Sequence, residues 1–148
     1  MPLLNYTTTI EADKTVAQIQ AILVKHGAKA ILAEYGQQGN IETLAFKVNT
    51  PHGEVAFKLP VYPDSIQKVL TRQRVPFRYC NHAQAIRIAW RIVKDWVEAQ
   101  MALLETEMVR MEQIFLPYAV TKNGKTLYEN LVESRFKQLQ SPEEASPK

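Results

Sequence analysis

The sequence predicts an α+β fold: a β-α-β-β-β, largely antiparallel sheet covered by helices, followed by a long C-terminal helix and a short terminal helix. Three observations lead to this class. Apolar and polar residues alternate over 30–61, the connections within that stretch are of hairpin type, and apolar residues recur at helical spacing before and after it. At 148 residues the chain suits one domain, expected over 1–140. The polar, proline-containing stretch 141–148 is expected to be a disordered tail.

The first two predicted elements are a strand and a helix. Residues 3–10, LLNYTTTI, are rich in β-branched and aromatic residues and predict a strand. Asp13 then precedes apolar residues at helical spacing, which predicts a helix over 14–26 that Gly27 ends.

Three strands are predicted next, at 30–35, 41–49 and 54–61, separated by the turns GQQGN and TPHG. Pairing residue 49 with 54 and residue 36 with 41 places one set of apolar side chains on a single face, because side chains alternate with a period of two. The pairs expected on that face are Val48–Val55, Phe46–Phe57, Leu44–Leu59, Ala33–Leu44 and Ile31–Phe46. This register leaves Lys47 and Lys58 on the opposite face.

Two more helices follow in the prediction. Asp64 and Gln67 form a capping-box pattern for a short helix that Pro76 ends. The same pattern at 81–84 opens a proline-free amphipathic run over about 82–115, which predicts one long helix or two nearly continuous ones. A single helix of this length spans about 50 Å, more than a small domain is wide, so we expect part of it to project or to pack on another chain.

The apolar stripe of the long helix favours a homo-oligomer, because strands of this length cover only part of it. The surplus residues are Met101, Leu104, Met108, Met111 and Phe115. They would meet either a last amphipathic helix, predicted near 125–139, or a second subunit. We expect a homodimer with the acidic segment 95–112 near the two-fold axis.

Positive charge is concentrated in one stretch of the chain. From Ser65 to Lys94 the sequence holds seven Lys or Arg and no Asp or Glu, and TRQRVPFRY sets arginines among aromatic rings. Cations bind phosphates, and rings or guanidinium planes stack on unpaired bases, so nucleic acid is the expected partner. The candidate nucleic-acid-binding residues are Arg72, Arg74, Arg78, Arg87, Arg91, Lys94, Phe77, Tyr79, Lys47 and Lys58.

Two other uses of this charge remain open. It can be a solvated or internally paired face with the neighbouring rings in the core, or it can pair with the acidic segment of another subunit and drive assembly. The binding interpretation requires one contiguous exposed surface with Lys94 at its edge. The arginines expected on that surface are Arg74, Arg78, Arg87 and Arg91.

No catalytic, metal or cofactor site is expected. The three histidines lie far apart in the sequence without neighbours at metal-ligand spacing, and the glycines fall at turns and helix ends rather than in a phosphate-binding loop. Cys80 is the single cysteine and has no histidine partner visible in the sequence. A cytoplasmic protein without a membrane-spanning segment is expected, because the chain shows no secretory signal and no apolar run of about 20 residues.

The segments MPLLNYTTTI, AWRIVKDWVEAQMALLE and IFLPYAV resemble a group of small uncharacterised proteins encoded in prophages and other mobile elements of Gram-positive bacteria. The resemblance brings no fold, activity or functional residue with it and implies only a setting. In that setting we expect a non-catalytic accessory protein that binds single-stranded or structured DNA or RNA. The alternative is a small inhibitor that binds an acidic or nucleic-acid-associated component of a host defence system through its basic face.

Overall fold

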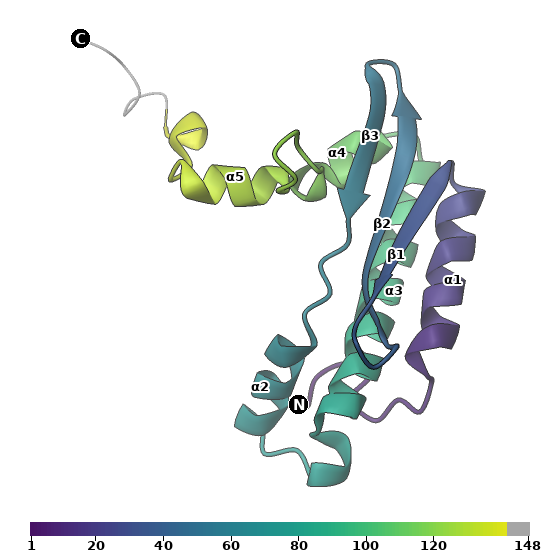
Figure 1. The fold of residues 1–148 in the computed structure, drawn as a ribbon, viewed down its shortest axis with the longest axis vertical. Helices are drawn as coiled ribbons and strands as arrows, with labels where there is room; N and C mark the ends of the chain where they lie inside the picture. The colour runs from purple at the N-terminus through teal and green to yellow at the C-terminus, as the bar shows by residue number, and fades with distance from the viewer. Residues whose placement is uncertain (142–148) are drawn as a thin grey trace.

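Helices and strands form an α+β fold in the computed structural model, which describes residues 1–141 (Figure 1). The helices are α1 (Ala12–Lys25), α2 (Pro63–Arg72), α3 (His82–Glu105), α4 (Met111–Ile114) and α5 (Leu127–Glu133). The strands are β1 (Ala30–Tyr35), β2 (Ile41–Thr50) and β3 (Gly53–Lys58). Short 3-10 turns are η1 (Phe77–Tyr79), η2 (Leu116–Tyr118) and η3 (Lys137–Leu139). The tail predicted at 141–148 lies, apart from its first residue, outside the described residues.

The three strands form an antiparallel sheet in the order β1-β2-β3, with the predicted register confirmed. The observed pairs include Val48–Val55, Phe46–Phe57, Ala33–Leu44 and Ile31–Phe46. The first hairpin closes differently from the prediction. A bulge between Glu34 and Tyr35 pairs Tyr35 with Ile41, and the Gly36 N–H donates to the Asn40 carbonyl oxygen over 2.8 Å.

One face of the sheet packs against α1 and α3, which lie side by side; in Figure 1, α3 passes behind the strands and α1 lies next to β1. The inward side chains of the strands are buried against the apolar side of these helices. They include Leu44, Phe46, Val48 and Phe57 from the sheet, Ile19 and Leu23 from α1, and Trp90, Val93 and Val97 from α3. The opposite face of the sheet carries Lys47 and Lys58, as predicted, and both are exposed.

The predicted first strand is wrong: residues 3–10 form turns and irregular chain in front of α1. Asn5 adopts a left-handed φ of 66°, which is incompatible with a strand. The backbone groups of the segment bond to side chains rather than to a neighbouring strand: the Leu3 N–H donates to the side chain of Gln73, and two carbonyl oxygens of the segment accept from the side chain of Gln84. The core unit is therefore α-β-β-β.

The prediction of one projecting helix over 82–115 is also wrong. The helix α3 ends at Glu105, and Glu107 takes a left-handed φ of 63°. The chain then reverses and α4 begins after Arg110, whose backbone N–H donates to the side chain of Gln113 over 2.8 Å.

Because the chain reverses, the last residues of the predicted apolar stripe pack against the sheet and α3 of the same chain. Phe115 is fully buried and contacts the rings of Phe46, Phe57 and Trp96 at centroid distances of 5.3 to 5.9 Å. Met101 and Met111 are buried as well, while Met108 in the connection stays 71% exposed. Apart from Met108, the surplus apolar residues are covered within one chain. The homodimer with the acidic segment 95–112 near its axis stays a prediction.

Residues 116–139, from η2 to η3, lead away from the sheet at a steep angle to the strands and are named the arm here (Figure 1). Its helix α5 is shorter than the predicted 125–139, because Arg135 and Phe136 adopt left-handed φ values of 58° and 56°. A Thr126–Glu129 capping box starts it. The rest of the described chain, residues 1–115, is named the body. The Val120 N–H of the arm donates to the Ala56 carbonyl oxygen at the edge of β3 over 2.8 Å, and the Tyr118 ring packs on Trp96 at 5.5 Å.

Candidate nucleic-acid interface

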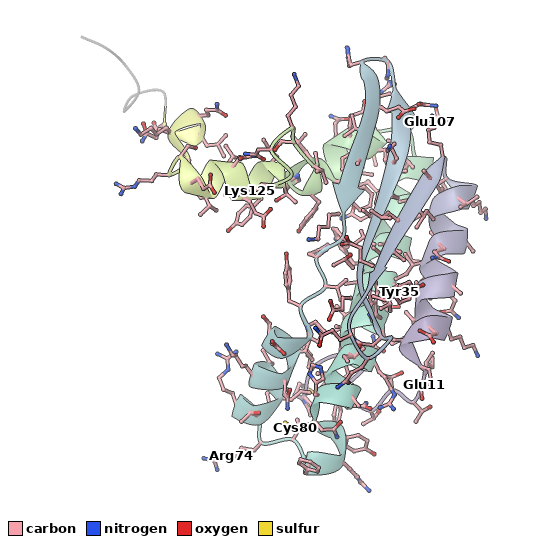
Figure 2. The ribbon with its side chains drawn as sticks, in the orientation of Figure 1. Glu11, Tyr35, Arg74, Cys80, Glu107 and Lys125 are labelled. Atoms are coloured by element: carbon pink, nitrogen blue, oxygen red, sulfur yellow. The ribbon has the colours of Figure 1, made fainter. Side chains whose placement is uncertain are left out.

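Five exposed residues form a basic surface at the end of α2 and in the connection to α3, named the basic tip. They are Lys68, Arg72, Arg74, Phe77 and Arg78. Figure 2 shows Arg74 pointing outward at this end of the molecule, away from the sheet. None of these four cations forms an ion pair with a carboxylate of residues 1–141. The tip therefore presents uncompensated positive charge to solvent.

The connection that carries the tip is ordered by its own backbone contacts. Arg74 has a left-handed φ of 58°, which turns the chain out of α2, and the Val75 N–H donates back to the Leu70 carbonyl oxygen over 3.2 Å. Asn81 then joins the two ends of the connection, since its side chain donates to the Phe77 carbonyl oxygen over 2.9 Å and accepts from the backbone N–H of residue 84 at the start of α3. The arginines are thus held on a defined loop.

The two aromatic rings of this region differ in environment. Tyr79 is half-buried, packs edge-to-face on Tyr6 at 5.6 Å, and carries the Arg78 guanidinium over its ring at 4.8 Å. Phe77 is 80% exposed. An exposed ring set among arginines can stack on an unpaired base.

The prediction of one exposed surface is wrong for the ridge on α3. Arg87 is half-buried, with its Nε 2.9 Å from a Glu11 carboxylate oxygen. Arg91 donates to Gln18 over 2.7 Å. Lys94 pairs with Glu98 on the same helix at 3.1 Å. These cations are internally paired, and the two arginines join α3 to α1 and to the residue before it.

Two residues of this region were not among the predicted candidates: Lys68, which lies within the acid-free stretch and is exposed on α2, and Gln84. Gln84 is buried, and its Nε2 donates to the carbonyl oxygens of Tyr6 and Thr8 over 3.0 and 2.9 Å, while its Oε1 accepts from Arg87 over 2.9 Å. The capping pattern at 81–84 predicts only that its side chain reaches back to the helix start. The sequence carries no signal for the carbonyls of the N-terminal segment.

Lys47 and Lys58 belong to the uncovered sheet face rather than to the tip. Lys47 lies 3.9 Å from Glu54, which also pairs with Lys29, and these contacts hold the pKa of Glu54 below its ordinary value, the Lys29 hydrogen bond being the main cause. Lys58 lies beside the base of the arm, where it adds to the lowering of the Glu129 pKa, which is caused mainly by a hydrogen bond from the backbone of residue 126.

Residues 1–141 contain no cluster of three or more His, Cys, Asp or Glu that could hold a metal ion. His26 instead ties the ends of α1 and α3 together: Nδ1 lies 2.8 Å from the Ile22 carbonyl oxygen and Nε2 lies 2.7 Å from Glu105. The hydrogen bond from His26 holds the pKa of Glu105 below its ordinary value. Cys80 is half-buried, with its Sγ 3.4 Å from the Thr71 hydroxyl.

No helix in the described part of the chain is long and apolar enough to cross a bilayer. The chain matches no protein-family model, no curated protein and no solved structure. The resemblance to proteins of prophages and mobile elements therefore stays a prediction, and any function has to be argued from the tip itself.

Proposed function

We propose that this protein is a non-catalytic nucleic-acid-binding accessory protein of a phage or mobile element and that the basic tip is its binding surface. The observation that carries the proposal is an 80% exposed phenyl ring in one short segment with three exposed arginines that have no carboxylate partner in the described residues. Each component has a partner in nucleic acid, since guanidinium groups bind phosphates and the ring stacks on a base.

Single-stranded or locally unpaired nucleic acid is the preferred ligand. Base stacking on a side chain requires a base face that is not covered by its neighbours, and a regular duplex hides these faces. The tip is a turn with one protruding ring and offers no long helix for a major groove, because its exposed cations come from α2 and the loop after it.

The test is fluorescence anisotropy with a labelled single-stranded oligonucleotide over a range of salt concentrations. Replacing Arg72, Arg74 and Arg78 by Gln should weaken binding and reduce the steepness of log affinity against log salt by up to about 0.7 for each of these arginines that neutralises a phosphate. The matched control replaces Lys14, Lys25 and Lys122 by Gln; these exposed lysines lie outside the tip, and the change removes the same net charge. Equal weakening in both triple variants would contradict a localised site.

Phe77→Ala tests the stacking contact separately from charge. We expect affinity to fall roughly 5- to 150-fold, corresponding to about 1–3 kcal/mol for one stacked base, with the salt slope unchanged. Tyr35→Ala is the control, since Tyr35 is 64% exposed at the end of β1. An unchanged affinity in Phe77→Ala would reduce the tip to a purely electrostatic surface.

The alternative is that the tip occupies the binding site of an acidic protein, as an inhibitor of a host defence component would. Its prediction differs at the first step: oligonucleotide affinity would be negligible even at low salt. Arginines and aromatic residues are also enriched in the hot spots of protein interfaces, so this outcome would keep the surface and change the partner.

A further inference from the structure

The arm has no buried residue of its own among 116–139, although it is rich in large apolar side chains. Five of them are between 37% and 65% exposed: Leu116, Tyr128, Val132, Phe136 and Leu139. Exposed apolar side chains gathered on one short segment, rather than scattered singly, mark an interaction surface.

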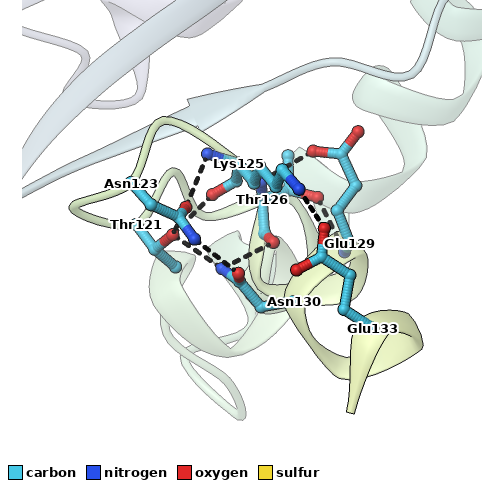
Figure 3. A network of polar contacts seen from close by, with 7 residues as sticks. All are labelled: Thr121, Asn123, Lys125, Thr126, Glu129, Asn130 and Glu133. Carbon is cyan, nitrogen blue, oxygen red and sulfur yellow. Dashed lines mark hydrogen bonds and ion pairs between the residues drawn. The ribbon is translucent and has the colours of Figure 1, made fainter. Parts of the chain in front are cut away.

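Polar contacts (Figure 3) and one ring contact, between Tyr128 and Phe136 at a centroid distance of 6.0 Å, give the arm its shape. The Asn130 side chain donates to the Thr121 hydroxyl over 2.7 Å and accepts from Asn123, while Thr126 and Glu129 cap the start of α5. An isolated helix of seven residues is marginal in water, so these contacts define a conformation without supplying an apolar core to stabilise it.

The outer end of the arm is basic. Arg135 and Lys137 are exposed and form no ion pair with a carboxylate of the described residues, and they flank Phe136 with Leu139 nearby in the chain. This end therefore combines two cations with two exposed apolar side chains.

The body carries a surface of the opposite sign. A hollow between the start of β2, the β3–α2 connection and the start of α3 has an apolar lining that includes Ile41, Val61 and Ile86. Two exposed acids, Glu42 and Asp64, lie at this hollow, named the acidic hollow, and neither forms an ion pair with a Lys or Arg of residues 1–141. His82 also lines the hollow, with its Nδ1 3.9 Å from Asp64.

Tyr62 connects the acidic hollow with the base of the arm. It is 64% exposed and lines both this hollow and a second one that it shares with Tyr118 and Tyr128. Within one chain the arm leads away from the sheet, so its outer end does not turn back to α2 (Figure 1). The acidic hollow and the basic arm end can therefore meet only between different molecules.

We propose that the arm of one copy docks into the acidic hollow of a second copy and that the second copy returns the same contact. A two-fold arrangement sets the two α5 helices antiparallel and directs each basic arm end towards the other molecule's Glu42 and Asp64. The apolar side chains of residues 136 and 139 enter the lining of the hollow, and Tyr128 and Val132 face their symmetry equivalents. The two-fold axis makes the contact reciprocal and uses both surfaces of each chain, so the assembly closes as a dimer, whereas a one-way contact would continue into a filament.

The first experiment is sedimentation velocity of the full chain from low to high micromolar concentration at low salt. We expect a reversible shift from the 16.9 kDa monomer to twice that mass. The dimer should weaken as salt is raised, because its charge pairs are exposed to solvent. A chain that stays monomeric at all concentrations would overturn the proposal.

Charge reversal then tests the pairing itself. The variant Arg135→Glu/Lys137→Glu and the variant Glu42→Lys/Asp64→Lys should each be monomeric, because each places like charges across both contacts. An equimolar mixture should dimerise again. In the mixed dimer the acidic arm of the first variant meets the basic hollow of the second, and the native basic arm of the second meets the native acidic hollow of the first, so both contacts join opposite charges. All four positions are exposed, and circular dichroism spectra that match the wild type show that the variants fold.

A matched control separates this pairing from general attraction between oppositely charged proteins. Lys14→Glu/Lys25→Glu on α1 changes the net charge by the same amount as the arm variant. It should dimerise like the wild type by itself, and it should form no mixed dimer with Glu42→Lys/Asp64→Lys beyond what the wild type forms. Dimers that survive both reversals would place the interface elsewhere. The proposal is independent of oligonucleotide binding, so either can fail alone.

Discussion

Gln84 joins three parts of the molecule through one side chain. Its amide donates to two carbonyls of the N-terminal segment and accepts from Arg87, which itself pairs with Glu11. Two backbone carbonyls and one guanidinium group thereby find partners in a region where Gln84 is only 5% exposed. The residue explains why the segment before α1 lies against α3 instead of adding a strand to the sheet.

Gln84→Ala should lower the free energy of unfolding by about 1–3 kcal/mol, because it leaves polar groups without partners in a buried site. Urea unfolding followed by circular dichroism measures the change. Gln38→Ala, in the exposed turn between β1 and β2, is the control and should stay within about 0.5 kcal/mol of the wild type. A similar stability for both variants would mean that water satisfies the carbonyls.

At the scale of the element, α4 and the residue that follows it complete the core, although they lie beyond the end of α3. The chain turns back after α3 so that Phe115 contacts Phe46 and Phe57 of the sheet and Trp96 of α3. The turn places Glu107 in the left-handed region, which costs a free energy of the order of 1 kcal/mol. Burying a phenyl ring contributes about 1.5–3 kcal/mol. Burial outweighs the backbone strain, and the reversal is stable.

Phe115→Ala should destabilise the protein by about 3–5 kcal/mol, since it opens a cavity among three rings. Thermal and urea unfolding of this variant are compared with those of Met108→Ala, because Met108 lies in the connection between α3 and α4 and is 71% exposed. We expect the Met108 variant to unfold like the wild type. A small effect of Phe115→Ala would show that α4 is not part of the cooperative core.

At the scale of the whole molecule, burial is unevenly distributed. The sheet, α1 and α3 enclose the apolar cluster, whereas the arm contributes none of its buried members. Amide groups protected mainly by local hydrogen bonds open more easily than those in a packed core. The body and the arm should therefore differ in local stability even though one chain links them.

Hydrogen exchange measured by mass spectrometry on dilute protein should show slow exchange across the buried middle of α3 and fast exchange across α5. If the arm docks on a second copy, raising the protein concentration should slow exchange in α5 of the wild type and should have no effect on α5 of the variant Arg135→Glu/Lys137→Glu. Protection of α5 equal to that of α3 in dilute solution would contradict the absence of an arm core.

The sequence by itself determined the three strands of the sheet and their register up to the bulge at Glu34 and Tyr35, because hairpin pairing depends on the period-two pattern and on short turns that are local in the chain. It also located the basic tip, since the exposed cations at 72–78 lie close together in the sequence. Only the tertiary structure decided which arginines are free. Arg87 and Arg91 have the spacing of a binding ridge, but their partners Glu11 and Gln18 are more than 70 residues away.

The end of α3 was likewise decided by tertiary structure. No proline or glycine interrupts 82–115, so local propensity permits one continuous helix, and the break at Thr106 exists because the reversed chain buries Phe115 against the sheet. Local patterns determine structure where the competing contacts are also local. Where local propensity permits two structures equally, such as a continuous helix and a broken one, contacts between distant parts of the chain decide between them. The local sequence pattern does not indicate which one forms.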